Sequence, residues 1–288
     1  MNARFQDVVK NFTSILVDNY GVVTFADGLN VKAVEVLKKL RGMGKKVIFL
    51  SNATFTDPEQ RYAKKGLIKG IHYDAFVTSG QYANEDIKKG TLPCGRKYVV
   101  FGTANFKKPD KVPAIFNGSP YDLVVDPEDA DFVYCGIPQI NGEDRITMDD
   151  FYGELEKLAG MGLPMVCSNP DEIASEDGRW VIRQGSIVNA YRALGGQVVL
   201  YGKPDPDIFD WVLGNEIARE KVLMVGDTLG TDILGANMAG VSSCLTIRGG
   251  VTEMRMLQRG MKVDNENIKA FIAATQSGIP NFIVDGIF

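Results

Sequence analysis

Several polar side chains stand where apolar runs end, and their types suit a shared site. Asp18, the pair Ser51 and Asn52, and Asp227 each come directly after a short run of apolar residues. In open parallel sheets, ligands bind just beyond the carboxyl ends of the strands. A charge at the end of a buried strand also needs a partner, because burying an unpaired charge is costly. The spacing therefore predicts one site to which all four residues contribute.

A pair of acids points to a metal ion at this site. Asp227 and Asp232 stand in "VLMVGDTLGTDILGANMAG", across a turn that begins a helix. If both approach Asp18, three carboxylates converge, and two like charges about 4 Å apart repel by roughly 4 kcal/mol at an effective dielectric constant near 20. Such a cluster calls for a cation or a shared proton, and hard oxygen ligands favour Mg²⁺. For Asp232 alone, stabilisation by the helix N-terminus is the alternative.

A lysine and two hydrogen-bonding side chains could hold an anion beside these acids. Lys203 follows an apolar run in "VVLYGKPDPDIF", where two prolines stiffen the turn and Asp205 or Asp207 can cap the next helix. A fixed ammonium there would neutralise both a nucleophilic carboxylate and a phosphoryl oxygen. Ser51 and Asn52 suit a phosphoryl oxygen as well, although "SNAT" alone is most often a helix cap or a turn.

The elements that must position these residues follow from the hydrophobic pattern. Short runs rich in Val and Ile suit a parallel sheet that is covered on both faces. Amphipathic stretches between them predict helices over residues 31–44, 147–162 and 205–215. Strands alternating with helices predict an α/β fold with right-handed crossovers. The expected strands cover residues 14–17, 46–50, 75–79, 97–102, 122–125, 131–136, 164–168, 198–201, 221–226, 243–247 and 281–284.

Length and composition narrow the class of protein. A chain of 288 residues is long for a single core, so two domains, or one domain with a large insertion, are expected. Hydrophobic residues make up 45% and charged residues 24%, which is ordinary for a globular protein. The net charge of -4 argues against nucleic acid as a main partner, because binding phosphates needs a basic surface.

The sequence shows no pattern typical of a secretory signal peptide, a membrane span or a common zinc site. The first residues lack the pattern of a signal peptide, and the apolar runs are far too short to cross a membrane. We therefore expect a cytoplasmic protein. His72 is the only histidine, which excludes a zinc site with several histidines, and the four cysteines form no Cys-x-x-Cys pair. Carboxylates, lysine and hydroxyls are the expected catalytic groups.

Taken in order, four stretches resemble the haloacid dehalogenase superfamily: "DNYGVV", "LSNAT", "GKPDPDIF" and "GDTLGTDILGANMAG". The insertion between the second and third, with "VTSGQYA" and "CSNPDEIASEDGRW", resembles the cap of the class IIA phosphatase branch. The resemblance covers nearly the whole chain. It implies a Rossmann-like, doubly wound parallel-sheet core formed by residues 1–78 and 184–288, with an inserted α/β cap domain over residues 79–183.

The resemblance also implies an Mg²⁺-dependent phosphatase that acts on a small phosphorylated metabolite. Asp18 would attack phosphorus and form an aspartyl-phosphate, Ser51 would bind the phosphoryl group, and Lys203 would steady both. Asp227 would bind Mg²⁺ together with Asp18, and Asp232 would support it. A homodimer is left open.

Tyr20 departs from the family pattern. Phosphatases of this family carry a second Asp two places after the nucleophile, which protonates the leaving group and then activates water. A tyrosine, with an ordinary pKa near 10, is a poor general base at neutral pH. The metal can still be bound, because the family takes its ligand here from the backbone carbonyl. The pattern Asp-x-Tyr-Gly also resembles the 2-haloacid dehalogenases, and a catalytically weak protein that binds a phosphorylated ligand is a further alternative.

Two residues of the expected cap are candidates for contacting the substrate. In "DGRWVIRQGSI", Trp180 could pack on a substrate ring and Arg183 could bind a negative charge. The alternative is that Trp180 packs at a hinge and that Arg183 is solvated.

Overall fold

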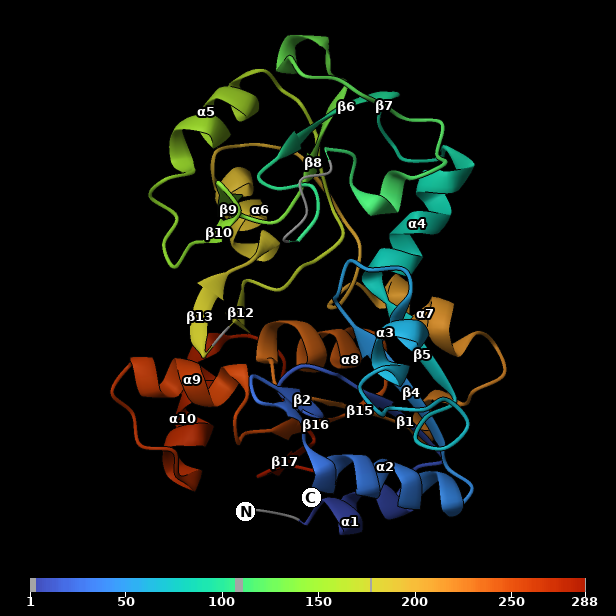
Figure 1. The fold of residues 1–288 in the computed structure, drawn as a ribbon. Helices are drawn as coiled ribbons and strands as arrows, with labels where there is room; N and C mark the ends of the chain where they lie inside the picture. Colours follow the sequence, from blue (N-terminus) through green and yellow to red (C-terminus); the bar gives the residue numbers. More distant parts are fainter. Residues whose placement is uncertain (1–3, 107–110, 177, 288) are drawn as a thin grey trace. The chain divides into compact units, whose positions relative to one another are not determined.

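The computed structural model describes residues 4–106, 111–176 and 178–287. The chain divides into two compact units, and Figure 1 shows their elements in sequence colours. Unit 1 comprises Met1–Ser51, Asp57–Thr78 and Lys203–Phe288, and unit 2 comprises Asn52–Thr56 and Ser79–Gly202. In the described part of the chain, every helix is too short or too polar to cross a membrane.

Within the described residues, unit 1 is built on a six-stranded sheet whose neighbouring strands are all parallel. The chain runs outward from β1 to β4 and β5, and then outward again on the other side from β15 to β16 and β17. This is a doubly wound sheet whose strand order reverses between β1 and β15. Across the sheet the strands are β17 (Phe282–Val284), β16 (Ser242–Thr246), β15 (Val222–Gly226), β1 (Ser14–Val17), β4 (Lys46–Ser51) and β5 (Ala75–Thr78).

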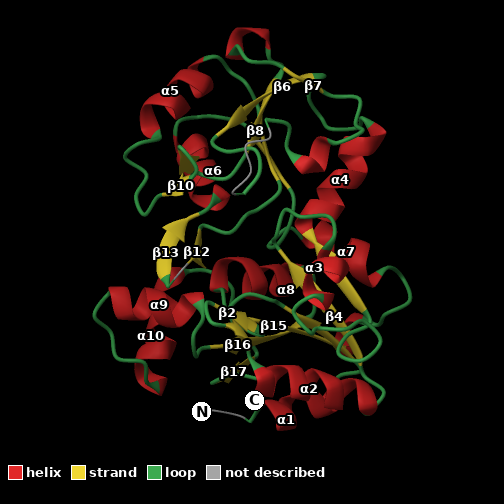
Figure 2. Cartoon of the chain, viewed as in Figure 1, coloured by secondary structure: helices red, strands yellow, loops and turns green. Residues whose placement is uncertain are grey.

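Helices lie on both faces of this sheet, with α2 on one face and α8 on the other (Figure 2). A short hairpin of β2 (Thr24–Phe25) and β3 (Gly28–Leu29) follows β1. The helices of unit 1 are α1 (Phe5–Val8), α2 (Val31–Gly42), α3 (Pro58–Ala63), α7 (Pro206–Leu213), α8 (Leu234–Met238), α9 (Val251–Gln258) and α10 (Asn265–Thr275), with the shorter turns η1 (Val9–Asn11), η4 (Arg219–Lys221) and η5 (Leu229–Ile233).

Local sequence explains where these elements begin and end. All residues of β1 and β15 are buried, as continuous apolar strands in the middle of a covered sheet must be. Helix α2 begins after Asn30, whose side-chain oxygen accepts hydrogen bonds from two backbone N–H groups of the first turn. Helix α7 begins after Asp205, whose carboxylate accepts from the N–H of Asp207 at 3.0 Å, with Pro206 at the first helical position.

Unit 2 has its own parallel sheet, in the order β14 (Val198–Leu200), β11 (Met165–Cys167), β8 (Phe132–Cys135), β6 (Lys97–Phe101) and β7 (Asp122–Leu123). Its other elements are the helices α4 (Ser79–Lys89), α5 (Tyr152–Gly160) and α6 (Gln184–Ala193), the turns η2 (Ala114–Phe116) and η3 (Pro127–Asp129), and the hairpins β9 (Gln139–Ile140) with β10 (Glu143–Asp144) and β12 (Ile173–Glu176) with β13 (Arg179–Ile182).

The α/β fold predicted from the sequence is confirmed. Each of the eleven expected strands is present, and the expected helices are α2, α5 and α7, although α5 begins five residues later than expected. The three hairpins were not predicted: most of their strands have only two residues, and the apolar residues of β13 were assigned to no strand. The division of the chain differs from the expected one, since unit 2 continues past residue 183 to Gly202.

Packing explains why residues 184–202 belong to unit 2. Strand β14 pairs in parallel with β11, with Val198 opposite Met165. Helix α6 buries Ile187 and Tyr191 in the same apolar cluster as Leu155 of α5. The chain therefore returns to unit 1 at Lys203.

The packing of Phe49 in the core of unit 1 gives a prediction about the stability of the protein. Phe49 of β4 is fully buried and stacks on Phe76 with ring centroids 4.6 Å apart. Phe49→Ala should lower the free energy of unfolding by about 3–5 kcal/mol, because it leaves a cavity in a packed core. Urea unfolding followed by circular dichroism measures this loss. Val31→Ala is the control, since Val31 is 73% exposed and its replacement should change stability by less than about 0.5 kcal/mol. Equal effects of the two substitutions would contradict the described packing.

Candidate active site

Three of the predicted residues lie side by side at the carboxyl ends of neighbouring strands in the sheet of unit 1. Asp18 directly follows β1, Asp227 directly follows β15, and Ser51 is the last residue of β4. These strands are neighbours in the order β15, β1, β4, and in the ladders Val17 lies opposite both Val225 and Phe49. Their carboxyl ends therefore meet at the point where the strand order reverses, which is the usual ligand position in such sheets.

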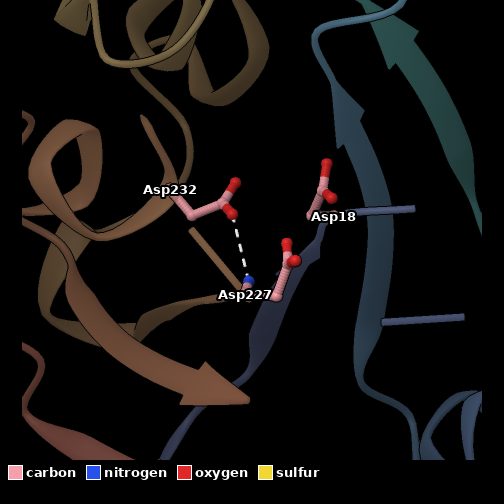
Figure 3. Close-up of side chains that lie close together, drawn as sticks. All are labelled: Asp18, Asp227 and Asp232. Atoms are coloured by element: carbon pink, nitrogen blue, oxygen red, sulfur yellow. Dashed lines mark hydrogen bonds between the residues drawn. The ribbon is translucent and has the colours of Figure 1, made fainter. Parts of the chain in front are cut away.

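Three carboxylates converge at this edge (Figure 3). Asp18, Asp227 and Asp232 each offer an oxygen, and these oxygens lie within 4.8 Å of one another. All three residues are buried, with 8%, 2% and 1% of their surface exposed. Because burial strengthens the repulsion between like charges, this arrangement needs compensating positive charge.

Lys203 supplies part of that charge. Its Nζ donates hydrogen bonds to Oδ1 of Asp18 at 2.7 Å and to Oδ1 of Asp232 at 2.6 Å. It also donates to the backbone carbonyl of Leu50 at 2.7 Å, next to the end of β4. The side chain is 1% exposed, so the ammonium is held almost entirely by these protein oxygens. The structure thus joins residues that are 185 positions apart in the sequence.

Asp232 holds the loop that carries Asp227. It lies in η5, a π-helical turn that leads into α8. Its Oδ2 accepts hydrogen bonds from the backbone N–H groups of Asp227 at 3.1 Å and of Thr228 at 3.0 Å, and the first of these is the dashed line in Figure 3. With Lys203 bound to Oδ1, both oxygens of Asp232 already have protein partners. This carboxylate therefore orients its neighbours.

Asp227 lies at the N-terminal end of α9. Its Oδ2 accepts a hydrogen bond from the backbone N–H of Val251 at 2.6 Å, and its backbone carbonyl accepts one from the Thr252 hydroxyl at 2.6 Å. The N-terminus of a helix stabilises a nearby negative charge. Sequence reasoning missed both contacts, since the only signal is a pair of glycines before "VT" in the sequence.

Gly21 lets the chain after β1 pass close to Asp227. Its φ is +83°, and a Cβ at this position would lie 2.4 Å from Oδ2 of Asp227. Any side chain would therefore collide with the carboxylate and strain the backbone as well. The glycine that follows Tyr20 is required by this close approach.

Asn19 fixes the loop between Asp18 and Tyr20. It is 3% exposed, its amide Nδ2 donates to the hydroxyl of Tyr62 on α3, and its Oδ1 accepts from the Thr24 hydroxyl at 2.9 Å. Burial is the largest cause that raises the pKa of Tyr62, so its phenol stays protonated at neutral pH. Sequence reasoning missed this network, because it joins residues 43 positions apart through side chains that carry no motif.

Tyr20 and Asn52 each lie within two residues of Asp18 or Ser51 in the sequence. Tyr20 is half-buried, two residues after Asp18, and pairs with Thr24 through an isolated bridge. Asn52 directly follows Ser51 but belongs to unit 2, where its Nδ2 donates to Oδ1 of Asp171 at 2.9 Å. This contact gives the amide a role within unit 2.

The two predicted substrate contacts lie in unit 2. Trp180 is half-buried on β13, opposite Ser175 of β12. Arg183 is 6% exposed, and its guanidinium forms ion pairs with Asp144 at 2.8 Å and Glu176 at 2.7 Å. Arg183 is therefore not the solvated arginine of the alternative interpretation. It joins the two hairpins of unit 2.

His72 takes no place in the cluster. It precedes β5, so it lies near the amino end of this strand, whereas the cluster lies at the carboxyl ends of β1 and β15. Its Nδ1 accepts the backbone N–H of Ile68 at 2.9 Å, and burial lowers its pKa. His72 is therefore a loop residue whose ring is bonded to the backbone.

Comparison with known proteins identifies the family of the chain. Residues 15–109 match the family described as haloacid dehalogenase-like hydrolase, and residues 200–270 match the family described as HAD-hydrolase-like. A 4-nitrophenylphosphatase of Schizosaccharomyces pombe is 24% identical over 272 residues, which cover 86% of this chain and 88% of the relative.

Solved structures share the fold. A haloacid dehalogenase-like hydrolase of Brucella suis superposes with a TM-score of 0.78 at 23% identity, covering 100% of both chains. A glycerol phosphate phosphatase of Mycobacterium tuberculosis, solved in complex with magnesium, gives a TM-score of 0.60 at 23% identity, over 87% of this chain and 71% of that one. The chain belongs to the haloacid dehalogenase-like hydrolases, in their class IIA phosphatase branch.

Proposed function

We propose that the chain is an Mg²⁺-dependent phosphatase that hydrolyses small phosphorylated metabolites through an aspartyl-phosphate on Asp18. One observation carries the proposal: three buried carboxylates converge at the carboxyl edge of the sheet, and a buried ammonium bridges two of them. A related 4-nitrophenylphosphatase and a structural neighbour solved with magnesium support it.

The donor set fits Mg²⁺. Hard carboxylate oxygens and a backbone carbonyl are the ligands that this ion accepts, and it keeps several waters. We assign Asp18, Asp227 and the Tyr20 carbonyl as direct ligands. Asp232 is assigned as their support, because one of its oxygens already binds the Lys203 ammonium and the other accepts from two backbone N–H groups. Lys203 balances one of the three negative charges, and a divalent cation would balance the other two. When bound, Mg²⁺ would also neutralise charge on the phosphoryl oxygens.

The protein groups divide the chemistry as follows. One oxygen of Asp18 attacks phosphorus while the bond to the leaving oxygen breaks. The ammonium of Lys203 holds the charged side chains of the site in place. The Ser51 hydroxyl donates a hydrogen bond to the transferred phosphoryl group. Water then releases phosphate from Asp18. Asn52, Trp180 and Arg183 stay predictions as substrate-binding residues.

Tyr20 limits proton transfer in this scheme. The phenol occupies the position of the usual general acid, and losing acid-base help costs roughly 10²- to 10⁴-fold in rate. A catalytically weak protein that binds a phosphorylated ligand is therefore the second candidate. The 2-haloacid dehalogenase interpretation rests on Asp-x-Tyr-Gly, but that reaction needs no metal, whereas this site gathers three acids.

Metal binding gives the first functional test. Mg²⁺ should raise the melting temperature of the folded protein, because a ligand that binds only the native state stabilises it. Asp227→Asn should remove most of this increase, since it weakens one direct ligand. Differential scanning fluorimetry over a range of Mg²⁺ concentrations measures the effect. An unchanged Mg²⁺ response in Asp227→Asn would reject this residue as a ligand.

Gly21 provides a test of the site's geometry. Gly21→Ala should weaken Mg²⁺ binding about 10- to 100-fold, because the new Cβ displaces the carboxylate of Asp227. Gly28→Ala is the matched control: Gly28 also has a positive φ, of +117°, but its Cβ would meet nothing within 4 Å. Isothermal titration with Mg²⁺ compares the two variants. Equal losses in both would show that backbone strain, and not displacement of Asp227, is responsible.

The roles of Asp18 and Lys203 can be distinguished by the hydrolysis rates of their variants. Hydrolysis of p-nitrophenyl phosphate should vanish in Asp18→Asn, because the amide cannot serve as the nucleophile. Lys203→Ala should lose roughly 10²- to 10³-fold in kcat, the scale of one preorganised electrostatic contact. Release of nitrophenolate is followed by absorbance, with circular dichroism to verify folding. Metal-free release of chloride from 2-chloropropionate would favour the dehalogenase instead.

The leaving group should reveal the role of Tyr20. Nitrophenolate departs with little proton help, whereas alkyl phosphates need a proton and should react much more slowly. Tyr20→Asp should accelerate alkyl phosphates selectively, by up to roughly 10²-fold. The measured quantity is the ratio of kcat/KM for an alkyl and an aryl phosphate in both proteins. An unchanged ratio in a folded, Mg²⁺-binding variant would mean that Tyr20 does not replace the missing acid.

A further inference from the structure

The turn that follows Asp18 is organised around Asn19. The backbone carbonyl of Asn19 accepts hydrogen bonds from the N–H groups of Val23 at 3.0 Å and Thr24 at 2.8 Å. Its side-chain Oδ1 accepts the Thr24 hydroxyl at 2.9 Å, so the end of the turn is tied twice to this residue. Tyr20, whose backbone carbonyl is a proposed metal ligand, lies inside the turn. The position of Asn19 therefore affects where that carbonyl lies relative to Asp18.

The amide of Asn19 has a partner outside the turn, the phenol of Tyr62 on α3. Asn19 is 3% exposed and Tyr62 is 6% exposed, so protein groups must satisfy most of their hydrogen bonds. The Nδ2 of Asn19 donates to the phenol oxygen of Tyr62, 43 positions away in the sequence. Leaving a buried amide N–H without an acceptor is costly, because the group has given up water. This contact therefore holds the Asn19 side chain, and with it the turn, against α3.

Aromatic stacking fixes the ring of Tyr62. It stacks on Phe76 with ring centroids 4.8 Å apart, and Phe76 stacks on Phe49 with centroids 4.6 Å apart. Phe49 lies on β4 and Phe76 on β5, and both are almost fully buried, so the stack belongs to the core of unit 1. A ring packed in this way has little freedom to move its hydroxyl. Tyr62 thus connects two packed strands of the sheet to the turn beside the nucleophile.

We propose that Tyr62 is a positioning residue of the active site. Its hydroxyl, acting through the Asn19 amide, sets the position of the Tyr20 carbonyl relative to Asp18. The inference rests on the proposed function, in which that carbonyl and Asp18 bind Mg²⁺. Without the hydroxyl the buried amide loses its acceptor, and the turn gains freedom to move. The N–H of Asp18 keeps its hydrogen bond to the carbonyl of Val225 at 2.8 Å, so the change is concentrated in the turn.

Tyr73 offers a matched control. It is fully buried and meets the rings of Phe49 and Phe76 edge-on, with centroids 5.5 and 5.9 Å apart. In the described part of the protein its hydroxyl has no hydrogen-bond partner. Tyr62→Phe and Tyr73→Phe therefore remove the same atom from the same aromatic cluster, but the second removal takes no acceptor away from Asn19.

Hydrogen exchange followed by mass spectrometry tests the contact itself. In the metal-free protein, the backbone amides of residues 19–24 should exchange about tenfold faster in Tyr62→Phe than in the wild type, because a buried donor that loses its acceptor makes local opening easier. In Tyr73→Phe their exchange should match the wild type. Equal exchange in all three proteins would overturn the proposal, and this result depends on neither metal nor substrate.

Steady-state kinetics with p-nitrophenyl phosphate test the effect on the reaction. Tyr62→Phe should lower kcat about 10- to 100-fold, the range for groups that orient metal ligands. KM should change by less than about threefold, because the phenol acts on the turn and is given no contact with the substrate. Tyr73→Phe should leave both constants unchanged. An unchanged kcat in Tyr62→Phe would overturn the positioning role even if the turn exchanges faster.

The Asn19→Ala background separates positioning from a general structural effect. Once the amide is gone the phenol has nothing to hold, so Tyr62→Phe should change kcat by less than about twofold there, whereas independent effects would multiply. Multiplied losses would overturn the proposal. Failure of the proposed function gives a different result: the wild type itself would show no hydrolysis that depends on Asp18 and Mg²⁺. Hydrogen exchange would then decide on its own whether Tyr62 holds the turn.

Discussion

The ammonium of Lys203 is the contact on which the candidate site depends. It lies between Asp18 and Asp232, contacts the carbonyl of Leu50, and is almost completely buried. Removing one partner of such a pair costs about 3–5 kcal/mol, because it leaves an uncompensated buried charge. Lys203 is also the first residue after the chain returns from unit 2 to unit 1.

The remaining contacts place Asp227 beside this ion pair. Asp232 orients the backbone of Asp227 from one side, and the beginning of α9 binds its carboxylate from the other through Val251. Gly21 brings the chain that follows β1 against the same carboxylate without a side chain in between. Each of these contacts fixes one position, and together they hold like charges close to one another. Such an arrangement stores electrostatic repulsion that a divalent cation relieves.

The sequence predicted the parts of the site that a local pattern marks. Asp18, Asp227 and Lys203 could be found because each follows an apolar run that ends abruptly. The partners of Asn19 and Asp227 could not, because one is a phenol distant in sequence and the other a backbone N–H group. The predicted boundary at residue 183 placed β14 with the core domain. A short apolar run has the same pattern in either sheet, so the sequence does not show that β14 pairs with β11. Most of the hairpin strands have two residues, which is too short for a periodic signal.

The central claim is that Asp18 itself becomes phosphorylated. The most direct measurement is to mix the protein with Mg²⁺ and acetyl phosphate, quench with acid while the reaction proceeds, and locate the phosphoryl group by peptide mass spectrometry. The account predicts one phosphoryl group on the peptide that contains Asp18, removable by hydroxylamine as an acyl phosphate must be. A phosphoryl group on the Ser51 hydroxyl instead, or continued turnover with no covalent label on any peptide, would contradict it.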